Sequence, residues 1–310
     1  MFTPLLRPVA YAYLFLFSLL LAFESTGQQL MFEKQAEGWM LLEEGQPRYF
    51  YQTATKSLDG LYPRANYIHP LYDTEGEVIT EDFPADHPHH RGVFWTWHQL
   101  WVNDQRAADP WICEDIVWEV KKVKTAINPN GSASLEATIL WKGTGKIQKN
   151  LVQETLIVTF QRVSSAAYKL TFDIELKPLL KNIRLGGSED AKGYGGFSPR
   201  IRLGNNAGFY DENGKVLPQE LPVRAGPWIN LTAGGPEDPG TVIMGEPEKL
   251  PSYQGWILRS KNSMQNLAFP GKEPLLLDTK NPMSFRNQLL VHQGMGRQEI
   301  VDQYRIFRNQ

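Results

Sequence analysis

Residues 135–142 read LEATILWK, residues 152–161 read VQETLIVTFQ and residues 168–176 read YKLTFDIEL. In each segment, most apolar side chains alternate with polar or charged ones. In an extended chain this period of two places alternate side chains on opposite faces, and it is typical of antiparallel strands that are half-buried. Asn130–Gly131 and Ser164–Ser165 are suitable turns between these segments. We therefore expect a large antiparallel sheet.

The rest of the chain extends this β pattern. A turn at Glu44–Gly45 separates two strand-like segments, and residues 285–292 alternate again. Tyr304, Ile306 and Phe307 indicate a last strand, and no stretch shows a helical period. The sequence therefore predicts an all-β fold, an antiparallel β-sandwich made of a large sheet or two packed sheets.

The first 27 residues predict an export signal. Arg7 gives a positive start, residues 9–23 form an apolar run, and Ser25–Gly27 supply small residues for cleavage before Gln28. The run is short for a membrane span, which needs about 20 apolar residues, although an uncleaved anchor is the alternative. We expect residues 28–310 to form one β-sandwich domain, located in the periplasm or outside the cell, with no membrane span.

Composition limits the classes of partner that the protein is expected to bind. The formal net charge is −2, which indicates neither nucleic acid nor an anionic membrane as a partner. Cys113 is the only cysteine, so no internal disulfide can form and core packing must stabilise the fold. Nine tryptophans and twelve tyrosines would fill a large core, and such rings also stack on sugars.

Four of the six histidines lie in residues 86–98, which read DHPHHRGVFWTWH. Imidazoles exchange protons or bind metals near neutral pH, and buried polar groups need partners. This stretch therefore predicts a polar site at the start of a buried strand. The alternative is a histidine-rich loop whose imidazoles bond only to backbone groups. Gly92 is suited to a bulge or to a close approach by another backbone.

An extended chain here would separate the histidines into two groups. His87 and His89 would share one face and His90 the other. At about 3.3 Å per residue, His87 and His89 would lie about 6.6 Å apart, close enough for a metal ion or a sugar hydroxyl to bridge them. By the same spacing, His90 and His98 would lie about 26 Å apart on a straight strand and could not share one metal ion.

Two other segments carry candidate residues. The loop from Trp101 to Trp111 carries aromatic side chains, which either line a cleft or cap a sheet edge. Residues 185–200 are rich in glycine but lack the spacing of a phosphate-binding loop. Within them, Glu189 is a candidate catalytic carboxylate and Arg200 a candidate substrate clamp, unless the segment is a mobile surface loop.

The run HPHHRG at residues 87–92, the tryptophans after it, the glycine-rich segment ending in Arg200 and the segment LLVH ending in His292 resemble one family. The chain resembles the DUF6807 family, often labelled methane oxygenase PmoA. A particulate methane monooxygenase subunit is a polytopic membrane protein, which conflicts with the lack of later apolar spans. The resemblance implies a secreted bacterial β-sandwich, similar in outline to the supersandwich folds of galactose mutarotase and glycoside hydrolases.

The sequence thus supports a carbohydrate-active enzyme of epimerase, lyase or hydrolase type. In it, His89 or His90 would act as general acid or base, and Glu189 would be the partner carboxylate. The substrate would be a carbohydrate or sugar-derived molecule. The residues expected to bind it are His87, Arg91, Trp95, Trp97, Trp101, Arg200 and His292.

Two alternatives stay open. The chain could be a non-catalytic carbohydrate-binding protein, in which aromatic side chains bind the sugar and the histidines only bond to its hydroxyls. It could also be an enzyme that needs a divalent metal bound by His87, His89 and His292. The sequence has neither the cysteine pairs of a zinc finger nor the His-Glu-x-x-His of a zinc protease.

Overall fold

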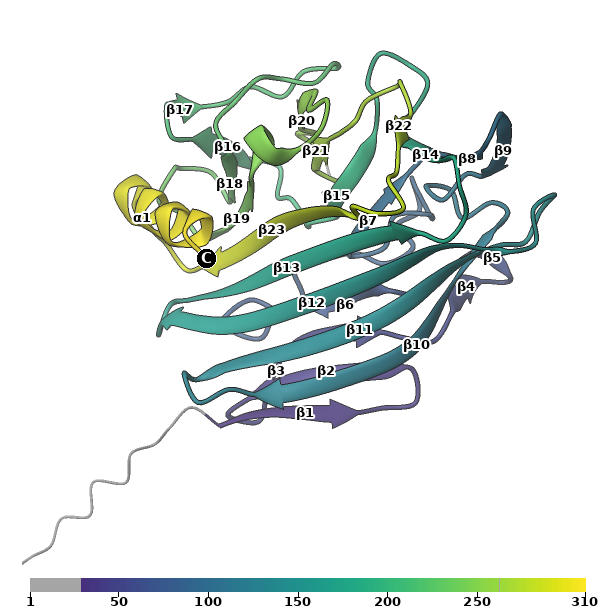
Figure 1. The fold of residues 1–310 in the computed structure, drawn as a ribbon. Coiled ribbons are helices and arrows are strands. Elements are labelled where there is room, and N and C mark those ends of the chain that lie inside the picture. The colour runs from purple at the N-terminus through teal and green to yellow at the C-terminus, as the bar shows by residue number, and fades with distance from the viewer. Residues whose placement is uncertain (1–28, 262) are drawn as a thin grey trace, which may run out of the picture.

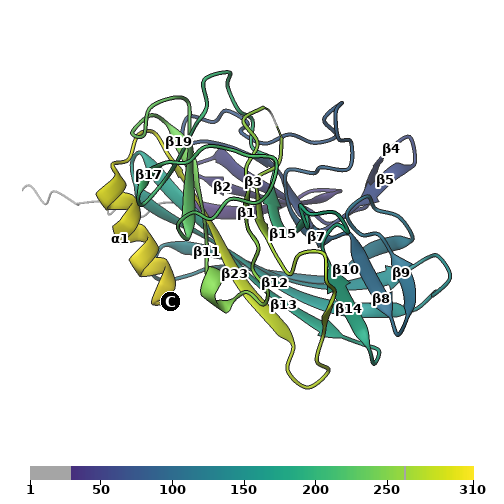
Figure 2. The ribbon, with the colours of Figure 1, turned by 90° about the horizontal axis from the view of Figure 1, so that it is seen from above.

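The computed structural model describes residues 29–261 and 263–310, so the predicted export signal lies outside the described residues. Two large antiparallel sheets face each other, as Figure 1 and the view from above in Figure 2 show. The predicted antiparallel β-sandwich is thereby confirmed. One continuous apolar core lies between the two sheets.

The first sheet has six strands, in the order β1 (Leu30–Lys34), β2 (Gly38–Glu43), β3 (Gln46–Gln52), β6 (Tyr67–Leu71), β7 (Val93–Trp97) and β15 (Gly195–Pro199). The second has nine, in the order β10 (Ile116–Ile127), β11 (Ser132–Gly143), β12 (Asn150–Ser164), β13 (Ala167–Pro178), β23 (Met283–His292), β19 (Gly240–Gly245), β18 (Trp228–Thr232), β16 (Gly208–Asp211) and β17 (Gly214–Lys215).

Smaller sheets flank this sandwich. One has the order β22 (Leu275–Leu276), β14 (Ile183–Gly186), β8 (Gln99–Val102) and β9 (Gln105–Ala108). Two pairs complete the set, β20 (Gly255–Ile257) with β21 (Asn266–Ala268), and β4 (Lys56–Leu58) with β5 (Leu61–Arg64). A short 3-10 helix, η1, spans Pro247–Lys249.

The alternation in β11, β12 and β13 predicts correctly which face is buried. Leu135, Val158 and Phe172 lie side by side across the three strands, and all are fully buried. Gly131 adopts a φ of 75° in the predicted turn before β11, a conformation that glycine accepts without strain. The alternation also places Glu154 on the inner face, in phase with Leu156 and Val158, and this charged side chain is completely buried.

Two of the tryptophans expected to bind sugar are core residues instead. All five residues of β7 are buried, because both faces of this strand are covered. Trp95 lies 5.9 Å from the ring of Phe172, and Trp97 lies 6.2 Å from that of Trp141. The prediction that Trp95 and Trp97 stack on a ligand is therefore wrong.

The C-terminal segment is a helix, α1 (Arg297–Arg308), and not the expected strand. Ile300, Tyr304 and Phe307 recur at the helical spacing of four and three, and they pack on the outer face of the nine-stranded sheet against Trp228 and Leu290. Burying each such side chain stabilises the fold by about 1.5–3 kcal/mol. Figure 1 shows α1 beside β18 and β19. No helix in the described part of the chain is long and apolar enough to cross a membrane.

Candidate functional site

The histidine run forms a turn and not an extended strand. The backbone N–H of His90 donates to the carbonyl oxygen of His87 at 2.9 Å, which places Pro88 and His89 at the corner. The His87 and His90 rings stack with centroids 4.8 Å apart, and the His89 ring lies 4.6 Å from that of His90. The prediction that His90 points away from His87 and His89 is wrong, because side chains alternate between two faces only in an extended chain and these residues form a turn.

A fourth imidazole joins this cluster from the other end of β7. The rings of His90 and His98 lie 5.9 and 5.2 Å from the ring of Trp111, which packs between them. The expected separation of about 26 Å is wrong, since the chain bends at Gly92 and again at His98, on either side of the strand. A Cβ at Gly92 would lie 2.0 Å from the carbonyl oxygen of Ile68, which confirms the close backbone approach predicted there.

The four imidazoles line one cavity of about 540 Å³, within the usual size range of ligand pockets. Tyr194 borders it from the glycine-rich segment, and Arg259 and Lys261 border it from the segment between β20 and β21. Asp86 is the only carboxylate that lines this cavity within residues 29–261 and 263–310.

Two of the imidazoles are oriented by carboxylates. His87 Nδ1 lies 2.9 Å from Asp86 Oδ2, and His98 Nδ1 lies 3.1 Å from Asp109 Oδ2. A carboxylate only accepts hydrogen bonds, so each Nδ1 carries a proton and donates it. In the neutral ring, Nε2 then keeps a free lone pair. An imidazole held in this way can act as a general base and, once protonated, as a general acid.

Other side chains fix the two carboxylates. Arg200 Nη2 donates to Asp86 Oδ1 at 2.8 Å, and Arg106 Nη2 donates to Asp109 Oδ2 at 3.0 Å. Partial burial raises the pKa of Asp86, but the hydrogen bonds from His87 and Arg200 outweigh it and bring the pKa below its usual value. Asp86 is therefore a carboxylate at neutral pH.

The other two imidazoles stay neutral. Arg200 Nη1 donates to His90 Nδ1 at 3.2 Å, so the proton of His90 sits on Nε2. Burial and the neighbouring imidazoles and guanidinium groups hold the pKa of His90 far below its usual range, and burial lowers the pKa of His89 to about 4. This environment suits His90 to donate a hydrogen bond and not to exchange protons.

Comparison with known proteins identifies the family. The family described as "Family of unknown function (DUF6807)" matches residues 39–305. The chain belongs to the DUF6807 family. Comparison with curated proteins gave no match.

Among the solved structures that resemble this DUF6807 protein in part is the alpha-galactosidase from Lactobacillus brevis, with 12% sequence identity and a TM-score of 0.36. The match covers 87% of this chain and 39% of that chain, so this DUF6807 protein spans about two fifths of the length of its neighbour. A likeness at this level says nothing about activity.

Both arginines expected to bind substrate are buried behind the cavity of this DUF6807 protein. Arg200 Nε donates to Glu81 Oε2 at 2.8 Å, in addition to its bonds to Asp86 and His90. Arg91 Nε donates to Asp82 Oδ1 at 2.5 Å, and its guanidinium group lies 3.6 Å from the centre of the Phe83 ring. The prediction that they clamp substrate is wrong, because both guanidinium groups are buried and their donors are used within the protein. Arg200 supports the histidine turn, whereas Arg91 bonds to Asp82, Tyr67 and two backbone carbonyl oxygens.

Three further candidates lie outside the cavity. Glu189 is exposed and pairs with Arg106 at 2.9 Å. The indole N–H of Trp101 donates to Gln99 Oε1 at 3.0 Å. His292 is buried beside a different cavity, with its Nε2 3.0 Å from Asn230 Oδ1.

The predicted metal ligands are only partly brought together. His87 and His89 have ring centroids 5.7 Å apart, but His292 lies beside another cavity and cannot complete a set with them. Across residues 29–261 and 263–310, no group of three or more His, Cys, Asp and Glu side chains could hold a metal ion.

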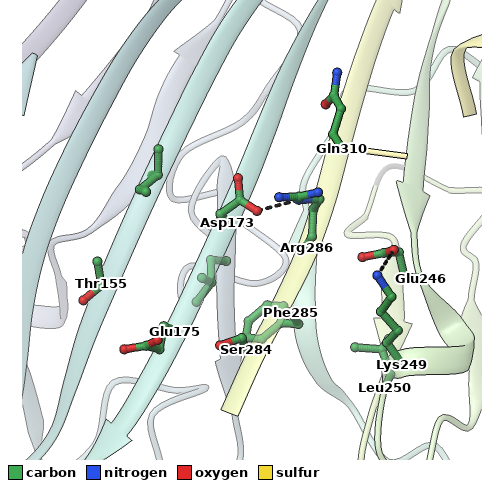
Figure 3. A pocket seen from close by; sticks show the side chains of 12 residues that line it. Thr155, Asp173, Glu175, Glu246, Lys249, Leu250, Ser284, Phe285, Arg286 and Gln310 are labelled. Atoms are coloured by element: carbon green, nitrogen blue, oxygen red, sulfur yellow. Dashed lines mark hydrogen bonds and ion pairs between the residues drawn. The ribbon is translucent and has the colours of Figure 1, made fainter. Parts of the chain in front are cut away.

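A second cavity, of about 460 Å³, lies on the outer face of the nine-stranded sheet (Figure 3). Its two basic side chains are already paired, Arg286 with Asp173 and Lys249 with Glu246, each at 2.5 Å. It contains no histidine. The histidine cavity combines neutral imidazoles with oriented ones, and we take it as the candidate site.

Proposed function

We propose that this DUF6807 protein is a carbohydrate-active enzyme in which His87 and His98 transfer protons. The observation that carries the proposal is that two imidazoles, each oriented by its own carboxylate, face one cavity. Two such groups can divide the work of an acid and a base. This is the chemistry that an epimerase, a lyase or a hydrolase of sugars requires.

The proton steps follow from the hydrogen bonds. The Nε2 lone pair of one imidazole removes a proton from the substrate, and the other imidazole, protonated, returns a proton to it. The negative charge of Asp86 or Asp109 stabilises the imidazolium ion that forms beside it. General acid–base catalysis of this kind accelerates a reaction by about 10²–10⁴-fold.

The rest of the lining supports a sugar as the substrate. The Nε2–H of His90 is a fixed donor, and the hydroxyl groups of Ser260 and Ser263 can both donate and accept. The half-buried ring of Tyr194 offers an apolar surface next to these groups. Alternating donors, acceptors and ring faces match the hydroxyls and C–H faces of a sugar. We also propose that the protein acts in the periplasm or outside the cell, as its N-terminal sequence predicts.

The test compares single variants on a sugar that the purified protein converts. We expect His87→Gln and His98→Gln each to lower kcat by about 10²–10⁴-fold, while the Kd for the sugar changes little. Glu189→Gln is the control, because Glu189 lies outside the cavity and forms an exposed ion pair worth about 0–1 kcal/mol. It should retain kcat within about fivefold.

Two results would overturn the proposal. Loss of activity in Glu189→Gln with normal activity in His87→Gln and His98→Gln would mean that the oriented imidazoles do not transfer the protons. Binding of a sugar with no turnover by the unaltered protein would instead indicate a carbohydrate-binding protein.

A further inference from the structure

Two basic side chains beside the cavity have no carboxylate partner among residues 29–261 and 263–310. The nearby carboxylates already have cationic partners, Asp86 with Arg200 and Asp109 with Arg106. Two basic side chains, Arg259 and Lys261, line the cavity directly. Neither forms an ion pair with any residue that the structure describes.

Arg259 is held in position by uncharged groups. Its Nη1 donates to the carbonyl oxygens of Gln219 and Leu258 at 2.8 and 2.9 Å. Its Nη2 donates to the hydroxyl of Tyr194 at 2.8 Å and to the carbonyl oxygen of Glu220 at 3.1 Å. These bonds fix the guanidinium group without neutralising it, so its charge stays available to a ligand.

We infer that the substrate is a sugar acid, whose carboxylate binds beside Arg259 and Lys261. This inference rests on the proposed function and adds the substrate class. A carboxylate fits better than a phosphate group, because both terminal nitrogens of Arg259 are used and only Nε–H and the Lys261 ammonium group remain.

A carboxylate at this place explains why the site needs two oriented imidazoles. The carbon next to a carboxylate is a weak acid, and nearby positive charge makes its proton easier to remove. The C–H bond breaks, the proton passes to Nε2 of His87 or His98, and the electron pair moves toward the carboxylate. In an epimerisation, this electron pair forms a new C–H bond with a proton from the second imidazole. In an elimination, the electron pair forms a C=C bond, the oxygen on the next carbon leaves, and the leaving oxygen takes the proton of the second imidazole.

The first experiment measures binding selectivity by calorimetry with matched ligands, a uronic acid, the corresponding neutral sugar and its phosphate ester. The His87→Gln/His98→Gln double variant is used alongside the unaltered protein, so that selectivity is read without turnover. We expect both proteins to bind the uronic acid at least about tenfold more tightly than either other ligand. Equal or tighter binding of the neutral sugar would overturn the inference. Tightest binding of the phosphate ester would also overturn it and would indicate a sugar phosphate as the substrate.

Lys261→Met is expected to lower the affinity for the uronic acid by about three- to tenfold and to leave the affinity for the neutral sugar unchanged. The matched control is Lys177→Met, since Lys177 is exposed on β13 and lies outside the cavity. An equal loss of affinity for the acid and the neutral sugar in Lys261→Met would contradict a role for its charge.

The second experiment follows the chemistry in deuterium oxide. We expect deuterium to enter the carbon next to the carboxylate, or an unsaturated uronate to form, and either product should disappear in His98→Gln. If neutral sugars are converted by a route that needs His98 while uronic acids are not, the substrate class is wrong and the proposed function stands. If conversion of a uronic acid does not need His87 or His98, the proposed function fails instead.

Discussion

The histidine cavity and the centre of the sandwich both bury ionisable groups among aromatic rings, but the two regions satisfy them differently. In the centre, Glu154 Oε1 accepts hydrogen bonds from Asn66 Nδ2 at 2.9 Å and Trp95 Nε1 at 2.7 Å, and its Oε2 accepts one from Trp141 Nε1 at 2.7 Å. In the cavity, His89 forms no hydrogen bond with any described residue, and the Nε2 atoms of His87 and His98 likewise have no such partner.

This difference in hydrogen bonding distinguishes Glu154, which stabilises the fold, from the imidazoles of the cavity, which can react with a ligand. Burial raises the pKa of Glu154 to about 7, although its three donors and Arg64 act in the opposite direction. Its carboxyl group is enclosed and all its donors come from the protein, so it can only hold the two sheets together. Each imidazole of the cavity keeps at least one nitrogen without a partner among the described residues, where a ligand can bond, which is the condition for catalysis.

The largest effect is expected for Asp109→Asn. This variant tests whether Asp109 only stabilises the fold, as Glu154 does, or orients a reactive imidazole. In Asp109→Asn, Oδ1 still accepts the backbone N–H of Trp111, but an amide N–H faces His98 Nδ1. Nδ1 must then accept, Nε2 carries the proton, and His98 can no longer act as a base. We expect kcat to fall by about 10²–10⁴-fold and the free energy of unfolding by about 1–3 kcal/mol, since Arg106 also loses its acceptor at Oδ2.

The measurement is a pH–rate profile together with urea denaturation of the same variant. A large loss of stability with an unchanged kcat would place Asp109 in the same class as Glu154. That result would remove the contrast between the two regions.

The next effect is expected at Glu154. In Glu154→Gln the side-chain amide N–H2 faces either the indole N–H of Trp141 or both donors that Oε1 accepts, from Asn66 and Trp95, so at least one buried donor loses its acceptor. We expect this variant to lose about 1–3 kcal/mol of unfolding free energy at a pH well below 4.5, where the carboxyl is neutral in both states. Its kcat per folded molecule should not change.

The pH dependence gives a second measurement on the same variant. The pKa of Glu154 in the folded protein, about 7, is above the ordinary value of 4.5, so the unfolded chain releases this proton first as pH rises. Between those two pH values the protein should lose up to about 3 kcal/mol of stability from this group. Glu154→Gln should lack that loss, and an equal loss in the variant would refute the assignment.

The two regions also differ in how far the sequence predicts them. Period-two alternation is a local property, so it correctly placed Leu135, Val158 and even the charged Glu154 on the inner face. The same logic failed at residues 87–90, because a turn there brings imidazoles together that an extended chain would separate. In the C-terminal helix, the apolar positions 300, 304 and 307 have a helical period. Reading only Tyr304, Ile306 and Phe307 hides this period and suggests a strand.

The partners that complete the cavity come from distant parts of the chain. Asp109 reaches His98 across a hairpin, and Arg259 enters from the loop between β20 and β21. The sequence offered one usable signal for them. The segment Asp109–Trp111 combines a carboxylate, a proline and a tryptophan in a loop expected to line a cleft, which is how the pair of His98 and its acid could have been found.

The last comparison is between two histidines, one that lines the cavity and one whose ring nitrogens are both bonded within the protein, and it ends on the smallest expected effect, a change in Kd. Burial lowers the pKa of His89 in the cavity and of His292 in the outer part of the fold to about 4, from 6.5. As pH falls from 6.5 to 4, the unfolded chain binds a proton at each site while the folded protein does not, so stability decreases by at most about 3 kcal/mol per group. His89→Gln and His292→Gln should each flatten this acid-side loss, measured by urea denaturation across that range.

Sugar affinity should then distinguish the two histidines. His292 has both ring nitrogens bonded within the protein, to Asn230 and to the backbone N–H of Gly294, so His292→Gln should leave the Kd for a sugar unchanged. His89→Gln should raise the Kd by about three- to tenfold, which corresponds to one hydrogen bond of about 0.5–1.5 kcal/mol. Equal effects of the two variants on the Kd would mean that burial alone sets the behaviour of these imidazoles, and that facing the cavity gives His89 no function of its own.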